Sequence, residues 1–302
     1  MPTSSLQAVV RAARPPFLLL TPACVLLGVA TALSSGAEIA TTRLILALIG
    51  AICAHISVNT FNEYFDDKSG LDATTHKTPF SGGSGALLEA PHAAFWVLGT
   101  AIVTLAITML VGAYFLVTIG AAIVPLGLVG VAIIVTYTQW INKSPWLCLI
   151  APGLGFGSLM VVGTHFVLTA QVTSLPLIAS LVPFFLVNNL LLLNQYPDIR
   201  ADQSVGRNHF PIAYGVNTSN GVFGLFTLAA TLTIIVAVVI SWFPLLSLLA
   251  LLPLIGSWAA FLAARQHSQN IDKLLPAMSL NVAATLLTPT VLALTLIFSG
   301  LI

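Results

Sequence analysis

The sequence predicts an all-α membrane protein, a bundle of nine transmembrane helices. Of the 302 residues, 58% are hydrophobic and only 6% are charged, whereas soluble domains carry about a quarter charged residues. The mean hydropathy is +1.02. Nine stretches are apolar over the roughly 20 residues that a helix needs to cross a bilayer. They are residues 17–34, 43–62, 93–115, 118–138, 146–168, 174–195, 221–242, 244–264 and 281–301.

The chain is expected to form a single domain over residues 1–302, because no stretch has the composition of a linker. Its surroundings are expected to be the lipid bilayer. Basic residues do not gather into a patch interleaved with aromatic residues, so nucleic acid is not expected as a partner.

The first apolar stretch has the outline of a signal peptide. Arg11 and Arg14 precede it, and the sequence "ATA" at 30–32 imitates a cleavage site. Many further apolar stretches follow, so we expect a retained first helix. The stretch 146–168 carries Gly153 and Gly157 in a GxxxG pattern, which is typical of two closely packed helices.

The basic residues predict the orientation of the chain. Nine crossings place the two ends on opposite sides of the membrane. If the N-terminus is cytoplasmic, all ten Lys and Arg residues except Arg43 fall on the cytoplasmic side. This asymmetry agrees with the positive-inside rule, so we expect a multi-pass protein of the inner or plasma membrane with a cytoplasmic N-terminus.

Two acidic clusters follow the apolar stretches 43–62 and 174–195. The first, "NTFNEYFDDKSGLD" at 59–72, places Asn62 and Asp66 four residues apart, with Asp72 beyond Gly70. The second, "NQYPDIRADQSVGRNHF" at 194–210, spaces its polar residues in the same way. Its members are Asn194, Asp198 and Asp202. Because residues four apart share one helix face, each helix end aims an amide and a carboxylate in one direction.

The two clusters are expected on the same side of the membrane, where their carboxylates would repel one another unless a cation lies between them. Mg²⁺ is bound in proteins by a few carboxylates together with substrate phosphates. Basic residues on the same side are candidates for holding the phosphates. They are Lys68, Lys77, Lys143, Arg200 and Arg207. The pattern therefore indicates a diphosphate held by Mg²⁺ at the cytoplasmic mouth of a central apolar cavity.

Both clusters resemble the aspartate-rich motifs of the UbiA superfamily of intramembrane prenyltransferases, and the expected nine helices agree with that family. The matching segments are "NEYFDDKSGLD" and "DIRAD". The stretch "PGLGFGSLMVVGTHFVLTA" at 152–170 is similar to the fifth helix of the 1,4-dihydroxy-2-naphthoate branch, which makes menaquinone precursors. The resemblance implies a prenyltransferase that uses Mg²⁺ to transfer an isoprenyl group from a prenyl diphosphate to an aromatic acceptor.

The resemblance also implies roles for single residues. The expected Mg²⁺ and diphosphate ligands are Asn62, Asp66, Asp72, Asp198 and Asp202. Lys143 and Arg207 are expected to contact phosphate, with catalytic roles beside Asp66 and Asp198. Substrate contacts are expected from Glu63, Lys77, Tyr137, Asn194 and Arg200.

The chain departs from the family pattern at several positions. Glu63 stands where Asp is usual, Phe156 where the naphthoate branch is expected to have Glu, and Asn208 and His209 where Lys or Arg followed by Thr is commoner. These differences leave the diphosphate chemistry intact. The acceptor stays open among naphthoate, hydroxybenzoate, homogentisate and a lipid, with naphthoate favoured.

Two alternative functions remain open at this point. A membrane terpene cyclase could use the same motifs without an acceptor. A transporter could also carry an acidic cytoplasmic mouth, although transporters usually place ionisable groups near the middle of the bilayer.

Overall fold

The computed structural model describes residues 3–75 and 77–299, and all regular secondary structure within these ranges is helical. Eight segments are long and apolar enough to cross a membrane. They are Pro15–Ser34, Thr41–Ser69, Pro91–Ile119, Pro145–Thr169, Ser174–Asn194, Phe210–Val239, Leu245–His267 and Ile271–Ser299. A shorter apolar helix, Ala121–Thr136, lies where the sequence predicts a crossing over 118–138. Eight predicted spans are therefore confirmed as sufficiently long helices, and the ninth crossing stays a prediction.

The helices of the first half are α1 (Ser5–Ala12), α2 (Pro15–Leu18), α3 (Leu20–Ser34), α4 (Thr41–Ser69), η1 (Leu71–Ala73), α5 (Ala86–Glu89), η2 (Pro91–Ala93), α6 (Ala94–Ile119), η3 (Ala121–Ile123) and α7 (Val124–Thr136). Those of the second half are η4 (Ile141–Lys143), α8 (Pro145–Gly153), the π-helical turn η5 (Leu154–Leu159), α9 (Met160–Thr169), α10 (Ser174–Asn194), α11 (Ile199–Ser204), α12 (Phe210–Val239), η6 (Leu245–Ala250), α13 (Leu251–His267) and α14 (Ile271–Ser299).

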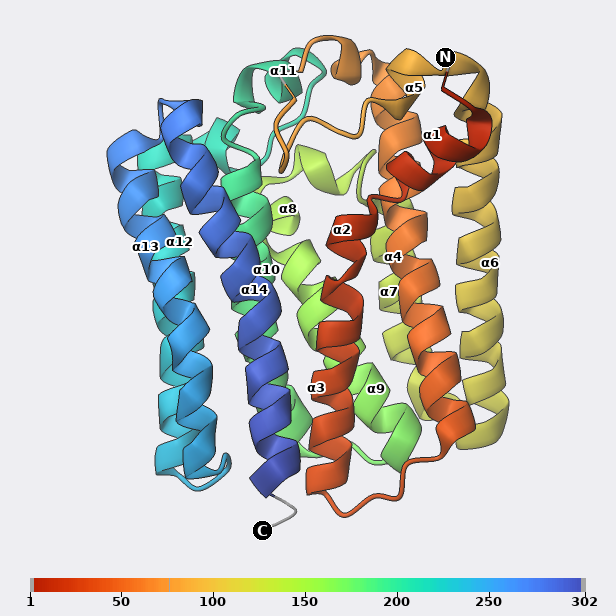
Figure 1. The fold of residues 1–302 in the computed structure, drawn as a ribbon. Helices are drawn as coiled ribbons and strands as arrows, with labels where there is room; N and C mark the ends of the chain where they lie inside the picture. Colours follow the sequence, from red (N-terminus) through yellow and green to blue (C-terminus); the bar gives the residue numbers. More distant parts are fainter. Residues whose placement is uncertain (1–2, 76, 300–302) are drawn as a thin grey trace.

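The long helices stand side by side in one bundle (Figure 1). The short helices α1, α5 and α11 lie together at one end, which we call the α11 end, and α14 finishes at the other. Helix α3 packs against α14 and α9, and α10 packs against α12, α14 and α8. A buried apolar core joins α3, α10, α12 and α14.

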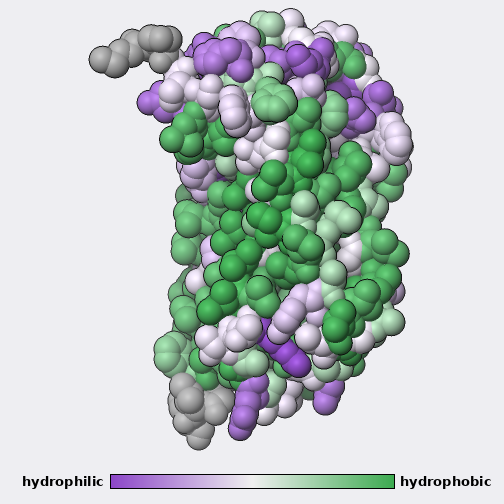
Figure 2. Space-filling model, turned by 90° about the vertical axis from the view of Figure 1, so that its right-hand side faces the viewer, coloured by the Kyte–Doolittle hydropathy of each residue, from purple (hydrophilic) through white to green (hydrophobic). Residues whose placement is uncertain are grey.

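The surface has the polarity expected of a protein in lipid. Figure 2 shows hydrophobic side chains around the middle of the molecule and hydrophilic side chains gathered toward its two ends. Only helices and closed barrels can cross a bilayer, because every backbone polar group there must be satisfied internally. The chain is therefore an integral, multi-pass membrane protein.

Three helices extend beyond the stretches that the sequence predicts. Helix α4 continues to Ser69 rather than ending near residue 62. Helices α12 and α14 begin at Phe210 and Ile271, about ten residues before the predicted starts at 221 and 281. Hydropathy detects the part of a helix that lies in hydrocarbon, whereas these extensions carry polar or charged residues such as Asp66, Asn217 and Asp272. Residues 300–301 of the last predicted span lie outside the described residues.

Glycines allow α8 and η5 to lie close to α10. A Cβ added at Gly153 or Gly157 would overlap the backbone of Phe184. The close helix packing predicted from the GxxxG pattern is thus confirmed. The same contact brings η5, with its irregular π-helical turn, beside the interior of the bundle.

Candidate active site

A cavity of about 730 Å³ extends from the α11 end into the apolar middle of the bundle. Its mouth is lined by both acidic clusters, including Asp66, Asp72, Asp198 and Asp202. Deeper in, its walls come from α4, α6, α7, η5 and α9 and are mostly apolar. The cavity can therefore hold a molecule with a strongly charged head and an apolar tail.

The first cluster is carried by the last two turns of α4 and by η1. Asn62 and Asp66 share a face of α4 and both line the cavity. Gly70 ends the helix with a φ of 75°, a left-handed conformation that glycine adopts without strain. The turn that follows buries Asp72 and brings it to the cavity wall.

The second cluster lies at the junction of α10 and α11. Asn194 is the last residue of α10, Asp198 immediately precedes α11, and Asp202 lies within α11. All three line the cavity. The two clusters, which have the same spacing in the sequence, therefore also lie at the same cavity mouth.

Arg207 connects the two clusters. Its guanidinium forms an ion pair with Asp66 of the first cluster, and another with Asp202 of the second at 2.8 Å. His209 Nε2 lies 2.9 Å from the other carboxylate oxygen of Asp202. The clusters consequently face each other across the width of a single guanidinium group.

Several oxygen atoms at the mouth remain free to bind a ligand. Within the described residues, Asp72 Oδ2, Asn194 Oδ1 and Asp198 Oδ1 are buried without a hydrogen-bond partner. Burial, then the charges of Glu63 and Asp66, raises the pKa of Asp72 to about 7. Burial, then the charge of Asp202, likewise raises the pKa of Asp198 to about 7. Such carboxylates are stabilised by an added cation.

The arrangement is not a complete metal site formed by protein alone. Over residues 3–75 and 77–299, no three Asp, Glu, His or Cys side chains are grouped closely enough to hold a metal ion. The unpaired oxygens nevertheless have the chemistry that Mg²⁺ prefers. Mg²⁺ commonly binds one or two carboxylates and completes its shell with water and substrate phosphates. The site therefore fits Mg²⁺ that arrives together with a phosphorylated substrate.

The glycine-rich segment 79–85 crosses the mouth between the clusters. Glu63 is buried away from the cavity lining and holds this segment, accepting hydrogen bonds from the backbone N–H groups of Ser84 (3.0 Å) and Ala86 (3.1 Å). On the other side, the N–H of Gly82 donates to Asp198 Oδ2 at 3.0 Å. Glu63 thus positions the segment, in contrast to the direct substrate contact predicted from the sequence.

Arg14 belongs to the same mouth and was not identified by the sequence analysis as a site residue. It lines the cavity, with Nη2 3.5 Å from Asn62 Oδ1 and 3.7 Å from Glu63 Oε2. Its backbone is left-handed, with a φ of 53°, where the chain turns from α1 into α2. In the sequence, Arg14 directly precedes two prolines and the first span. A basic residue at that position is equally well explained as an anchor of the cytoplasmic end of a helix, so the sequence did not single it out as a site residue.

Three basic residues predicted at the site lie outside the cavity lining. Lys77, Lys143 and Arg200 are exposed, whereas Arg207 is largely buried. Asn142, the neighbour of Lys143, lines the cavity instead. Tyr137 lies on the cavity wall as expected. Arg14 and Arg207 are therefore the basic side chains best placed to meet a phosphate in this structure.

Comparison with known proteins identifies a family and two curated relatives. The pattern of the UbiA prenyltransferase family matches residues 21–283. A 1,4-dihydroxy-2-naphthoate octaprenyltransferase of Bacillus subtilis is 29% identical over 171 residues, which are 56% of this chain and 53% of that protein. One of Haemophilus influenzae is 25% identical over 249 residues, 78% of this chain and 79% of that protein. The first match thus spans about half the length of its relative.

Solved structures show the same fold. A UbiA homologue of Archaeoglobus fulgidus bound to DMAPP and Mg²⁺ superposes with a TM-score of 0.64 at 14% identity, covering 93% of this chain and 99% of that one. The apo form of a homologue from Aeropyrum pernix K1 gives a TM-score of 0.70 at 17% identity, covering 95% of this chain and 98% of that one. At such identities the likeness concerns the fold alone.

Proposed function

Because the chain belongs to the UbiA prenyltransferase family and is a prenyltransferase, we propose that it transfers an isoprenyl group from a prenyl diphosphate to an aromatic acceptor, with Mg²⁺, and releases diphosphate. The proposed acceptor is 1,4-dihydroxy-2-naphthoate, the compound in the names of both curated relatives. One observation carries the proposal: a single cavity joins two facing acidic clusters to an apolar interior.

The diphosphate would lie at the mouth, where Arg14 and Arg207 neutralise negative charge. Asp66 and Asp202 already pair with Arg207. The residues that would hold Mg²⁺ are Asn62, Asp66, Asp72, Asp198 and Asp202, with Asn194 beside them. Bound Mg²⁺ would supply Lewis-acid stabilisation of the departing diphosphate.

The apolar part of the cavity would hold the isoprenyl chain and exclude water. The C–O bond to diphosphate breaks and its electron pair leaves with the diphosphate. The resulting allylic cation is shielded by apolar walls, and Tyr137 offers it an aromatic face from the end of α7. A ring carbon of the acceptor then forms the new C–C bond, and the ring loses a proton or its carboxyl group as carbon dioxide.

We propose the same topology as the sequence analysis, with nine crossings, a cytoplasmic N-terminus and the mouth facing the cytoplasm. Two features support it. The short apolar helix Ala121–Thr136 would supply the ninth crossing. The chain begins at the α11 end and α14 finishes at the opposite end, as an odd number of crossings requires (Figure 1).

The test uses the purified full-length protein in lipid nanodiscs. It is incubated with a labelled prenyl diphosphate, with Mg²⁺ or EDTA, and with or without 1,4-dihydroxy-2-naphthoate. We expect Mg²⁺-dependent release of diphosphate together with a prenylated naphthoate. Cyclised hydrocarbon formed equally well without acceptor would instead identify a terpene cyclase, and absence of diphosphate release from any prenyl diphosphate would reject the transferase chemistry.

A further inference from the structure

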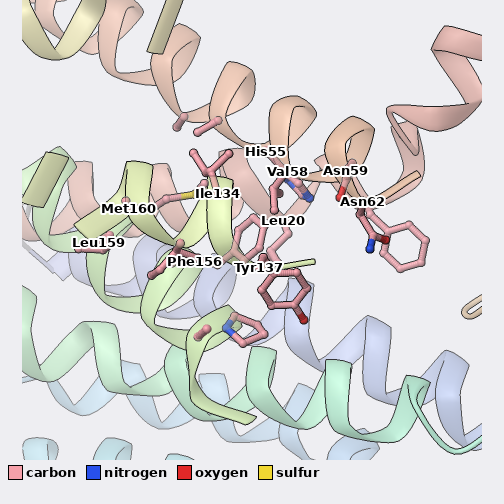
Figure 3. A pocket seen from close by; sticks show the side chains of 18 of the residues that line it. Leu20, His55, Val58, Asn59, Asn62, Ile134, Tyr137, Phe156, Leu159 and Met160 are labelled. Atoms are coloured by element: carbon pink, nitrogen blue, oxygen red, sulfur yellow. The ribbon is translucent and has the colours of Figure 1, made fainter. Parts of the chain in front are cut away.

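His55 is a buried histidine in the wall of the cavity, below the acidic mouth. It lies on α4 seven residues before Asn62, so that at 1.5 Å per residue it is about 10 Å deeper. Only 4% of its surface is exposed, and it lines the cavity. Figure 3 shows His55, Asn59 and Asn62 along one side of α4, with Tyr137 and Phe156 among the cavity residues.

The imidazole of His55 is held from two directions. Its Nδ1 lies 2.8 Å from the hydroxyl of Thr21 on α3. Its ring meets Phe156 of η5 edge to face, with the ring centroids 4.4 Å apart. No hydrogen-bond partner occupies the second nitrogen, Nε2, within the residues that the structure describes. The ring is thus fixed in place while one of its polar atoms stays free at the cavity.

A second buried histidine shows what a purely structural pair looks like in this protein. His165 is fully buried and contacts Thr31, also on α3, through Nδ1 at 3.1 Å. Its Nε2 is occupied as well, by the hydroxyl of Thr173 at 3.4 Å. His165 is not among the residues that line the cavity. The open nitrogen and the cavity position therefore distinguish His55 from a satisfied core histidine.

We propose that His55 Nε2 forms a hydrogen bond with a phenolic hydroxyl of the aromatic acceptor; this inference rests on the proposed function. A hydroxyl is the matching partner because it both donates and accepts hydrogen bonds. It can bond Nε2 in either tautomer, whichever one the contact with Thr21 selects. Phe156 provides an apolar face beside this point. An acceptor bound here lies between His55 and the mouth, next to the carbon from which diphosphate departs.

The test compares His55→Phe with His165→Phe in nanodiscs. Both variants replace a buried imidazole that contacts a threonine of α3, but only the first removes a polar group from the cavity. For His55→Phe we expect a rise of about fivefold to tenfold in KM for 1,4-dihydroxy-2-naphthoate, the factor that one lost hydrogen bond produces. The KM for prenyl diphosphate should change by less than about twofold, and His165→Phe should alter neither constant.

Two further measurements exclude a merely structural effect. An acceptor with its hydroxyls methylated should bind wild type more weakly than the parent compound, whereas His55→Phe should hardly distinguish the two. His55→Gln, which retains hydrogen-bonding capacity, should recover part of the acceptor affinity.

Unchanged acceptor KM in both His55 variants, with active wild type, would overturn this inference alone. Equal rises in the KM for acceptor and for prenyl diphosphate would also overturn it. A wild-type protein that prenylates no aromatic acceptor would instead overturn the proposed function, and this inference with it.

Discussion

Replacing Arg207 by Met should strongly destabilise the metal-free protein. The Arg207 side chain is only 16% exposed and pairs with two carboxylates that are 7% and 5% exposed. Without the guanidinium, Asp66 and Asp202 face each other with no intervening charge. Removing one partner of a buried ion pair costs about 3–5 kcal/mol.

The loss can be measured as a change in thermal midpoint. With an unfolding entropy of about 2.1 cal/mol/K per residue, each kcal/mol shifts the midpoint of this 302-residue chain by about 1.5 °C, so we expect a decrease of about 5 °C or more. The assay is the loss of monodisperse protein on heating in detergent with EDTA.

Arg200→Met is the matched control. Arg200 lies in α11, close to Arg207 in sequence, but it is exposed and lies outside the cavity lining. Its loss should shift the midpoint by less than about 2 °C, since exposed charges contribute little. Adding Mg²⁺ should restore the Arg207→Met variant more than it stabilises wild type, because the cation replaces the lost charge. Equal midpoints for wild type and Arg207→Met in EDTA would refute the reasoning.

Further outcomes follow from the cavity and its mouth. Asp66→Asn and Asp198→Asn should each lower prenyl transfer about 100-fold or more, whereas Lys143→Met, at an exposed position outside the lining, should stay within about twofold in the same turnover assay. Gly163 lines the cavity with open space around its missing side chain, so Gly163→Leu should shift the preference toward shorter prenyl diphosphates, measured by competition between chain lengths. Burial raises the pKa values of Asp72 and Asp198 from the usual 3.8 of an aspartate to about 7. These groups therefore contribute their full stability below about pH 4 and lose it as pH rises to about 7, so the midpoint of the metal-free protein should fall between about pH 4 and pH 7 and level off above that. Asp72→Asn should flatten that fall, and an unchanged pH profile would contradict the assigned burial.

Local pattern was sufficient to locate the acidic clusters in the sequence. Asn62 and Asp66 are four residues apart on one helix, so their common direction follows from helical geometry. The same spacing from Asn194 to Asp202 indicated a second cluster of the same kind, and both line one cavity. Local pattern did not reveal that α4 continues to Ser69, because the final turns of that helix are polar and hydropathy detects only the part in lipid.

The roles of individual charged residues were predicted less well. Glu63 was expected at the substrate, yet its carboxylate points to the backbone of segment 79–85. Lys143 was expected at the phosphates, yet it is exposed, and Arg14 from the other end of the chain lines the mouth. Position in the sequence fixes which side of the membrane a residue is on. It does not fix the direction of a long side chain at a helix end.

By itself, the sequence determined that this protein lies in a lipid bilayer and that the mouth of its cavity is acidic. A chain with 6% charged residues and repeated apolar stretches must satisfy its backbone within helices in lipid, and carboxylates placed at matching helix ends require a cation. Only the tertiary structure decided which basic side chain faces them. Arg207 meets Asp66 across 141 positions of the chain. Such a contact arises because packing brings η1, which directly follows α4, beside α11, and no local pattern records that.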